Sequence, residues 1–144
     1  MKIARVFHAD HGVSPGLIAW AAESAAPAEG GFFLRTLTLP DGEPDLLNGL
    51  YGPVCGDAPV TEYEVAWRRR SEDRPSSRIA VGRPKRPTRL VTIIGVASPE
   101  GVTVYTCYGG PAAEREPGDP SLAGDADAQE RSRAFWAHHA LADE

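Results

Sequence analysis

Two β-branched runs in the second half of the chain constrain the fold most strongly. Residues 88–96 and 102–108 are rich in Val, Ile and Thr, and the five residues between them include a proline and a glycine. Such a pair of runs is typical of an antiparallel hairpin. Strict alternation in the second run predicts one shared face for Val102, Val104, Thr106 and Tyr108.

Shorter elements are predicted on either side of this hairpin. We expect strands over residues 3–8, 32–39, 61–68 and 77–81, and helices over 14–26 and 125–141. The segment 61–68 fits an edge strand, with a helical turn at Glu62–Ala66 as the alternative. The 144 residues fit one domain, since a core usually takes about 100–200 residues. The prediction is therefore a single α+β domain over residues 1–144. Its mainly antiparallel sheet has about five or six strands, with one N-terminal and one C-terminal helix. Its core is expected to contain Ile3, Val6, Leu17, Ile18, Phe33, Leu37, Val91, Ile93, Val104 and Trp136.

Glycine and proline interrupt residues 40–60 so often that no long regular element is expected there. Long structured loops are uncommon unless they have a function. We therefore treat this loop as a candidate docking surface.

Charge is unevenly distributed along the chain. The net charge is −5, yet residues 68–89 hold nine basic and two acidic residues, and residues 114–144 hold eight acidic residues and three arginines. Clustered guanidinium groups bind phosphate oxygens well, so the segment 68–89 predicts RNA or another polyanion as partner. The alternative is a solvated basic loop, or one paired with the acidic C-terminal segment.

Three side chains at a predicted turn between strand and helix carry the most reactive chemistry. His8 and His11 flank Asp10, and imidazoles titrate near neutral pH. They suit acid–base catalysis, or a metal bound with Asp10, although a structural role explains them equally well.

A second cluster of polar groups lies at the end of the hairpin. Thr106 and Tyr108 precede two glycines that let a ligand approach the backbone, although Thr and Tyr are also ordinary strand residues. Cys107 has no neighbouring base that would activate its thiol.

Several classes of protein are excluded by what the sequence lacks. Cys55 and Cys107 cannot form a disulfide framework or a four-thiolate metal site. No phosphate-binding loop, dinucleotide fingerprint, zinc-protease motif or hydrolase elbow occurs. No signal peptide or membrane-spanning run is recognisable, so a cytoplasmic location without membrane contact is expected.

Two resemblances add to this interpretation. The segments 49–53, 56–60, 105–110, 116–120 and 135–141 resemble a group of small bacterial proteins of unassigned function. More remotely, a histidine-bearing segment before a helix, followed by antiparallel strands with a Thr-x-Tyr-Gly end, resembles the barnase/EndoU/colicin/RelE class of ribonuclease toxins. Those toxins are often basic overall, whereas this chain is acidic.

The leading hypothesis is a small, metal-independent enzyme that cleaves RNA by transesterification and needs no cofactor. His8 or His11 would act as acid and base, Arg78 or Arg89 would hold the phosphate, and Thr106 or Tyr108 would position the substrate. This hypothesis requires that these side chains converge. The alternatives are a non-enzymatic domain that binds protein or nucleic acid through the segments 40–60 and 68–89, and a metalloenzyme using His8, Asp10 and His11.

Overall fold

The computed structural model describes residues 1–3, 12–51, 64–69, 72 and 75–142. The chain divides into two compact units, each formed by two stretches of sequence. Unit 1 contains Met1–Asn48 and Arg86–Ala112, and unit 2 contains Gly49–Lys85 and Ala113–Glu144. The basic segment 68–89 therefore belongs to both units.

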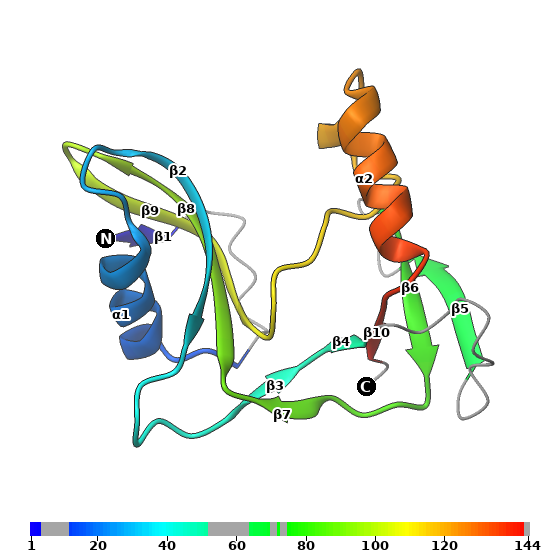
Figure 1. Cartoon of the computed structure of the whole chain (residues 1–144), viewed down its shortest axis with the longest axis horizontal. Coiled ribbons are helices and arrows are strands. Elements are labelled where there is room, and N and C mark those ends of the chain that lie inside the picture. The colour runs from blue at the N-terminus through cyan, green and yellow to red at the C-terminus, as the bar shows by residue number, and fades with distance from the viewer. Residues whose placement is uncertain (4–11, 52–63, 70–71, 73–74, 143–144) are drawn as a thin grey trace. The chain divides into compact units, whose positions relative to one another are not determined.

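Unit 1 combines one helix with a four-stranded and a two-stranded sheet (Figure 1). Its elements are β1 (Lys2–Ile3), α1 (Pro15–Ala25), β2 (Gly31–Thr38), β3 (Leu46–Asn48), β7 (Arg86–Thr88), β8 (Leu90–Ser98) and β9 (Gly101–Gly109). The larger sheet has the order β1-β9-β8-β2, with β1 parallel to β9 and the other neighbours antiparallel. β3 pairs with β7 in the smaller sheet.

Unit 2 combines a second four-stranded sheet with an α-helix (Figure 1). Its elements are β4 (Leu50–Tyr51), β5 (Glu64–Arg69), β6 (Ser76–Val81), the 3-10 helix η2 (Pro120–Leu122), α2 (Ala126–Trp136) and β10 (Ala140–Ala142). The order is β4-β10-β6-β5, in which β10 runs parallel to β6. The last strand of the chain thus joins two strands that are distant in sequence.

The predicted α+β class, with one N-terminal and one C-terminal helix, is confirmed. The expected hairpin is also present as β8 and β9. The single sheet of about five or six strands is wrong for the described residues, because their strands form three sheets. Local pattern predicts strands but not which strands pair, and pairs such as β10 with β4 and β6 join residues far apart in the sequence.

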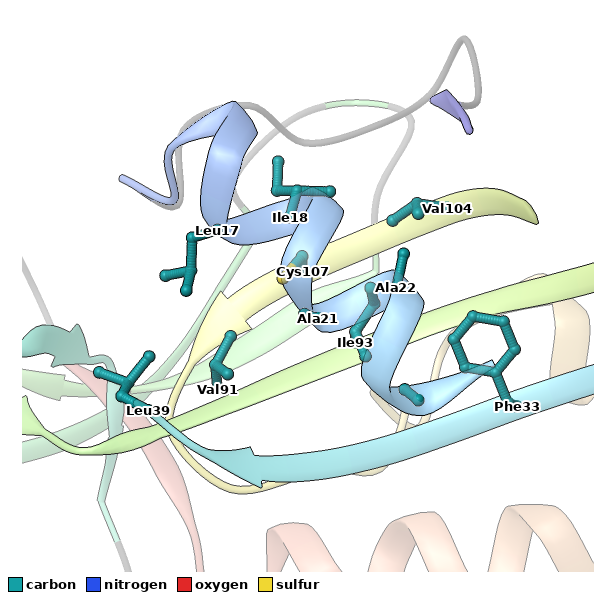
Figure 2. Close-up of a cluster of buried hydrophobic side chains, with 11 residues drawn as sticks. Leu17, Ile18, Ala21, Ala22, Phe33, Leu39, Val91, Ile93, Val104 and Cys107 are labelled. Carbon is teal, nitrogen blue, oxygen red and sulfur yellow. The ribbon is translucent and has the colours of Figure 1, made fainter. Parts of the chain in front are cut away.

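Helix α1 begins and ends close to where its sequence predicts. The Ser14 hydroxyl accepts a hydrogen bond from the Leu17 amide at 3.2 Å, and Pro15 occupies the first helical position. Leu17, Ile18, Ala21, Ala22 and Ala25 are buried at helical spacing. Figure 2 shows this face of α1 against side chains of β2, β8 and β9. Burial of each large aliphatic side chain contributes about 1.5–3 kcal/mol, so packing dominates the stability of α1.

A β-bulge in β9 overturns the predicted face of its polar residues. The register moves from Ile94 opposite Thr106 to Gly95 opposite Val104, which leaves Tyr105 as the extra residue. Val104 and Cys107 are consequently both in the core of unit 1. Thr106 and Tyr108 therefore lie on the opposite face from Val104, which corrects the strict alternation predicted for this strand.

The predicted core of unit 1 is otherwise largely found. Leu17, Ile18, Phe33, Val91, Ile93 and Val104 are buried and Leu37 is partly buried. Ile3 is 46% exposed on β1, which lies at an edge of the sheet. Val6 lies outside the described residues.

The C-terminal helix is shorter than its prediction over 125–141. It ends at Trp136, and the chain then turns into β10, so Leu141 is a strand residue paired with Leu50 and Ile79. Trp136 is buried, but in unit 2 and not in the core of unit 1. The pairing of residues 140–142 with β4 and β6 outweighs their weak helical pattern.

Candidate nucleic-acid interface

A shallow groove of about 390 Å³ lies on unit 2. Its lining comes from β5, β6, the loop before η2, and the C-terminal half of α2: Trp67, Arg78, Pro117, Arg133, Trp136 and Ala137. Two indole rings and two guanidinium groups therefore meet in one concavity, and none of the described lining residues is acidic.

Strand pairing places the first aromatic ring beside the first cation. Trp67 on β5 is directly opposite Arg78 on β6. Directly opposed residues have Cβ atoms about 4.5–5.5 Å apart and project from the same face of the sheet. The Trp67 side chain is 52% exposed, so part of its ring faces solvent.

Arg78 is fixed in place by the end of α2. Its Nη1 donates to the main-chain oxygen of Trp136 at 2.7 Å and to that of His139 at 3.4 Å. The last carbonyl groups of a helix lack partners within the helix and carry partial negative charge, so a guanidinium group stabilises them. Both bonds use Nη1, and the Nη2 and Nε edge of Arg78 makes no further hydrogen bond within the described part of the chain.

Trp136 supplies a rigid apolar wall. Its ring is almost fully buried, and its Nε1 donates to the main-chain oxygens of Glu114 and Arg115 at 3.0 and 3.1 Å. The Ser132 hydroxyl donates to the same Arg115 oxygen at 2.6 Å. These bonds attach one face of α2 to the loop that carries Pro117.

Helix α2 has a local sequence that fits its position. The Asp125 carboxylate accepts a hydrogen bond from the Ala128 amide at 3.0 Å and caps the N-terminus. Near the other end, Phe135 packs edge-on against Trp136 and stacks on the His139 ring at 3.9 Å. The helix therefore presents Arg133 and Trp136 from a defined terminus.

Arg133 is the cation most available to a ligand. Among the described residues, its ion-pair partner is Glu130, one turn earlier on α2, at 3.3 Å, and the two side chains are 60% and 79% exposed. Exposed ion pairs of this kind contribute about 0–1 kcal/mol. An anionic ligand in the groove can therefore replace Glu130 at little cost.

The loop beside the groove is held by polar contacts, one of them from a buried side chain. Ser77 on β6 is fully buried and donates to the Glu116 carboxylate at 3.0 Å. Asp119 caps η2 through the Ser121 amide. Desolvation raises the pKa of Asp119, but the hydrogen bonds from Ser121 and the charge of Arg115 outweigh it, so the pKa lies below its ordinary value. Asp119 is thus ionised at neutral pH and keeps the loop ordered.

The predicted catalytic residues fall into three groups. His8 and His11, with Asp10, lie outside the described residues. Arg78 belongs to unit 2, and Arg89, Thr106 and Tyr108 belong to unit 1. The convergence that the ribonuclease hypothesis requires remains a prediction.

Arg89 has a structural role in unit 1. Its Nη2 donates to the Pro40 oxygen at 2.9 Å, and its Nη1 contacts the Glu43 oxygen and, at 3.1 Å, the Asp45 carboxylate. The guanidinium group therefore closes the loop between β2 and β3.

Thr106 and Tyr108 are half-buried residues of β9. They lie opposite Ile94 and Thr92 of β8, on the sheet face away from α1. Their neighbours explain them as strand residues, and their predicted positioning role stays a prediction.

The sequence alone singled out Arg78 among the lining residues, but it gave no indication of Arg133 or Pro117. The lining residues span 67–137, and no local spacing links them. Arg133 is one of three arginines in a segment dominated by acids, so composition concealed its role.

Comparison of the chain with family models, curated proteins and solved structures finds no match. Both resemblances therefore stay predictions. No cluster of three His, Cys, Asp or Glu side chains suited to a metal ion occurs among the described residues. The helices of that same part of the chain are too short or too polar to cross a membrane.

Proposed function

We propose that unit 2 binds single-stranded nucleic acid in the groove, with a base stacked on Trp67 and the adjacent phosphates on Arg78 and Arg133. The single observation that supports this most is the exposed Trp67 ring directly opposite Arg78, with Arg133 lining the same concavity. Stacking on an exposed aromatic ring and guanidinium contacts to phosphate are the two interactions that single-strand binders combine.

The size and shape of the groove suit one nucleotide of a longer strand. Its volume of about 390 Å³ is near the lower end for small-molecule sites, which span about 300–1,000 Å³. The lining is mainly apolar with cations at its side, which matches a base beside a phosphate. Because the groove is shallow, a mononucleotide is expected to bind weakly. A longer nucleic-acid strand gains affinity from the cations beside the groove.

A further cation lies on β5, the strand that carries Trp67. Arg69 follows Trp67 by two residues, so both project from one face of β5, and Arg69 is exposed. A nucleic-acid strand that leaves the groove along β5 therefore meets the guanidinium group of Arg69. These contacts are local, so they act within a chain whose net charge is −5.

The test is binding of a fluorescein-labelled single-stranded RNA of about 12 nucleotides, followed by anisotropy over a range of salt concentrations. Neutralising about three phosphates gives a slope of log K against log[salt] near −2. Trp67→Ala is expected to weaken binding about 5- to 150-fold, since stacking contributes about 1–3 kcal/mol per base. Trp67→Phe keeps a stacking ring and retains most of the affinity.

Arg133→Ala and Arg131→Ala form a matched pair. Both arginines are exposed residues of α2, but only Arg133 lines the groove. Arg133→Ala is expected to weaken binding and reduce the salt slope by about 0.7, and Arg131→Ala to leave the slope unchanged. No binding at low salt, or equal effects of the two substitutions, contradicts the proposal.

The same preparation tests the predicted ribonuclease activity separately. Total RNA is incubated with the protein in EDTA and its length distribution is followed. Cleavage that His8→Ala or His11→Ala abolishes supports a catalytic function added to binding. RNA that stays intact at high protein concentration contradicts ribonuclease activity and leaves the binding proposal standing.

A further inference from the structure

His139 lies in the turn between α2 and β10, just after the helix that carries the groove residues Arg133 and Trp136. Its side chain is half-buried, and it is not one of the described residues that line the groove. Its main-chain oxygen nevertheless accepts a hydrogen bond from Arg78, a cation of the groove. His139 therefore connects the end of α2 to a site that its own ring does not reach.

The imidazole ring of His139 is held by a stack and by a hydrogen bond. It lies parallel to the ring of Phe135, with an interplanar angle of 1° and 3.9 Å between the ring centroids. Its Nδ1 atom lies 2.9 Å from the main-chain oxygen of Phe135. A carbonyl oxygen only accepts, so Nδ1 carries the proton in this contact. Both interactions fix the chain beyond Trp136, the last residue of the helix.

The last carbonyl groups of α2 are bonded by groups from outside the helix. The Phe135 oxygen accepts from the His138 amide at 3.0 Å as well as from the His139 ring. The next oxygen, that of Trp136, accepts from Nη1 of Arg78 at 2.7 Å. Terminal carbonyl groups have no partner within a helix, so these contacts decide how the helix ends. The His139 ring and the Arg78 guanidinium group thus share the work of capping α2.

Arg78 bonds to both sides of this turn through one nitrogen. Nη1 donates to the Trp136 oxygen and, at 3.4 Å, to the His139 oxygen. These two oxygens belong to residues three apart, so they face the same nitrogen only while the turn keeps its shape. An arginine side chain has many rotamers, and a ligand that must first order such a side chain loses affinity. The shape of the turn therefore bears on ligand binding through Arg78.

The groove wall formed by Trp136 has a separate support. Its Nε1 donates to the main-chain oxygens of Glu114 and Arg115, on the opposite side of the helix end from Arg78 in the hydrogen-bond network. Phe135 also packs edge-on against Trp136, with 5.1 Å between the centroids. Loss of the His139 ring leaves all of these contacts in place. Its effect on the groove is therefore expected to pass through Arg78.

We propose that His139 is a positioning residue of the groove, whose ring fixes the end of α2 in the shape that orders the Arg78 guanidinium group for a phosphate. The inference rests on the proposed binding of single-stranded nucleic acid and names a residue that prepares the site for it. His139 does not touch the ligand. It raises affinity because Arg78 is already ordered before the phosphate arrives.

Anisotropy of the same fluorescein-labelled single-stranded RNA tests the proposal. His139→Ala is expected to weaken binding about 2- to 10-fold, the range for one rotamer-rich side chain that must be ordered on binding. In an Arg78→Ala background the same substitution is expected to cause no further loss, because the two residues act through one contact. Equal losses in both backgrounds overturn the proposal, since they show an effect that does not pass through Arg78.

Gln129→Ala is the matched control for a general loss of stability. Gln129 is also a residue of α2 whose side chain bonds to a main-chain oxygen, that of Leu122 at 2.9 Å, and it does not line the groove. Its substitution is expected to lower the melting temperature as His139→Ala does, but to leave RNA affinity unchanged. A loss of affinity equal to that of His139→Ala overturns the positioning role.

Two conservative variants separate the contributions of the ring. His139→Asn offers an amide N–H in place of Nδ1–H, and His139→Phe keeps a ring to stack on Phe135. Each is expected to recover part of the affinity lost in His139→Ala. If the alanine variant does not fold, these two variants replace it in the comparison with and without Arg78, and affinities equal to wild type overturn the proposal. Circular dichroism establishes that each variant is folded.

The behaviour of the wild-type protein distinguishes the two proposals. Wild-type protein that does not bind the RNA at low salt contradicts the proposed function and, with it, the role of His139. Wild-type protein that binds the RNA no better than His139→Ala overturns the positioning role alone and leaves the proposed function standing.

Binding that weakens in His139→Ala, but not in Gln129→Ala or on top of Arg78→Ala, supports both.

Discussion

The Nη1 atom of Arg78 lies 2.7 Å from the main-chain oxygen of Trp136. This hydrogen bond connects β6, in the interior of its sheet, to the C-terminal end of α2. The same arginine lines the groove. The fold of unit 2 and the proposed ligand therefore both depend on the Arg78 guanidinium group.

Arg78→Ala is expected to lower the free energy of unfolding by about 1–3 kcal/mol, because the oxygens of Trp136 and His139 lose a charged donor. Arg78→Lys keeps the charge and an N–H donor group but lacks the planar guanidinium group, so a smaller loss is expected. Urea denaturation followed by circular dichroism measures both. An alanine variant as stable as wild type contradicts the structural role.

The Cys107 thiol is expected to be inert and to make the fold sensitive to alkali. Burial raises its pKa from 9.0 to about 12. Above about pH 9 the unfolded thiol ionises while the folded thiol stays protonated, which favours the unfolded state. The contribution to stability is complete below pH 9 and is lost as pH rises towards 12, with a slope of up to about 1.4 kcal/mol per pH unit.

The measurement compares unfolding free energies of the parent and Cys107→Ala proteins between pH 8 and 11, both in a Cys55→Ser background. Other groups titrate in this range, so the difference in slope isolates Cys107. Iodoacetamide at pH 8 is expected to modify the thiol only after unfolding. Rapid modification of the native protein is incompatible with this prediction.

Local sequence predicted the longer elements of this fold but not the short strands β3, β4, β7 and β10. Ser14 and Pro15 marked the start of α1, and the β-branched runs marked β8 and β9, because capping and strand patterns act over a few residues. The division of the described strands into three sheets was not predictable from local sequence. It depends on pairings such as Leu141 with Ile79, which join residues distant along the chain.

The site was predicted only in part for the same reason. Arg78 was singled out by the density of arginines around it, but its anchoring by Trp136 and His139 is a long-range contact. The face of Thr106 was predicted wrongly because one extra residue, Tyr105, reverses the alternation that follows it. A bulge of this kind has no composition signal in β9.

Gly95 is expected to resist substitution because two strands approach it closely. A Cβ atom there would lie 2.5 Å from the Thr103 main-chain oxygen and 2.9 Å from Cζ of Phe33. Gly95→Ala must therefore displace β9 or the Phe33 ring, at a cost of about 1–3 kcal/mol.

Gly16→Ala provides the comparison for this substitution, since a Cβ at Gly16 meets no atom within 4 Å and the residue lies in α1. It is expected to be neutral or to stabilise by up to about 1 kcal/mol. Thermal unfolding measures both effects: the melting temperature is expected to fall for Gly95→Ala and to stay unchanged or rise for Gly16→Ala. Equal melting temperatures for both variants contradict the close approach at Gly95.

A directional chain of hydroxyl groups crosses the larger sheet of unit 1. The Thr92 hydroxyl donates to the Gly110 oxygen at 2.8 Å, and its oxygen lies 2.8 Å from that of Thr36. A hydroxyl carries one proton, so Thr36 must be the donor to Thr92. Because Thr92 is fully buried and Thr36 is exposed, the two substitutions are not equivalent.

Thr92→Val is expected to cost about 1–3 kcal/mol, because the Gly110 oxygen loses its side-chain donor in a buried site. Thr36→Val leaves the bond from Thr92 to Gly110 intact and is expected to cost about 0.5–1.5 kcal/mol. The double variant should be less destabilised than the sum of the two, since Thr36 has no acceptor once Thr92 is gone. Urea denaturation of the four proteins completes the cycle. Equal single costs, or strict additivity, contradict the direction assigned to the chain from Thr36 through Thr92 to Gly110.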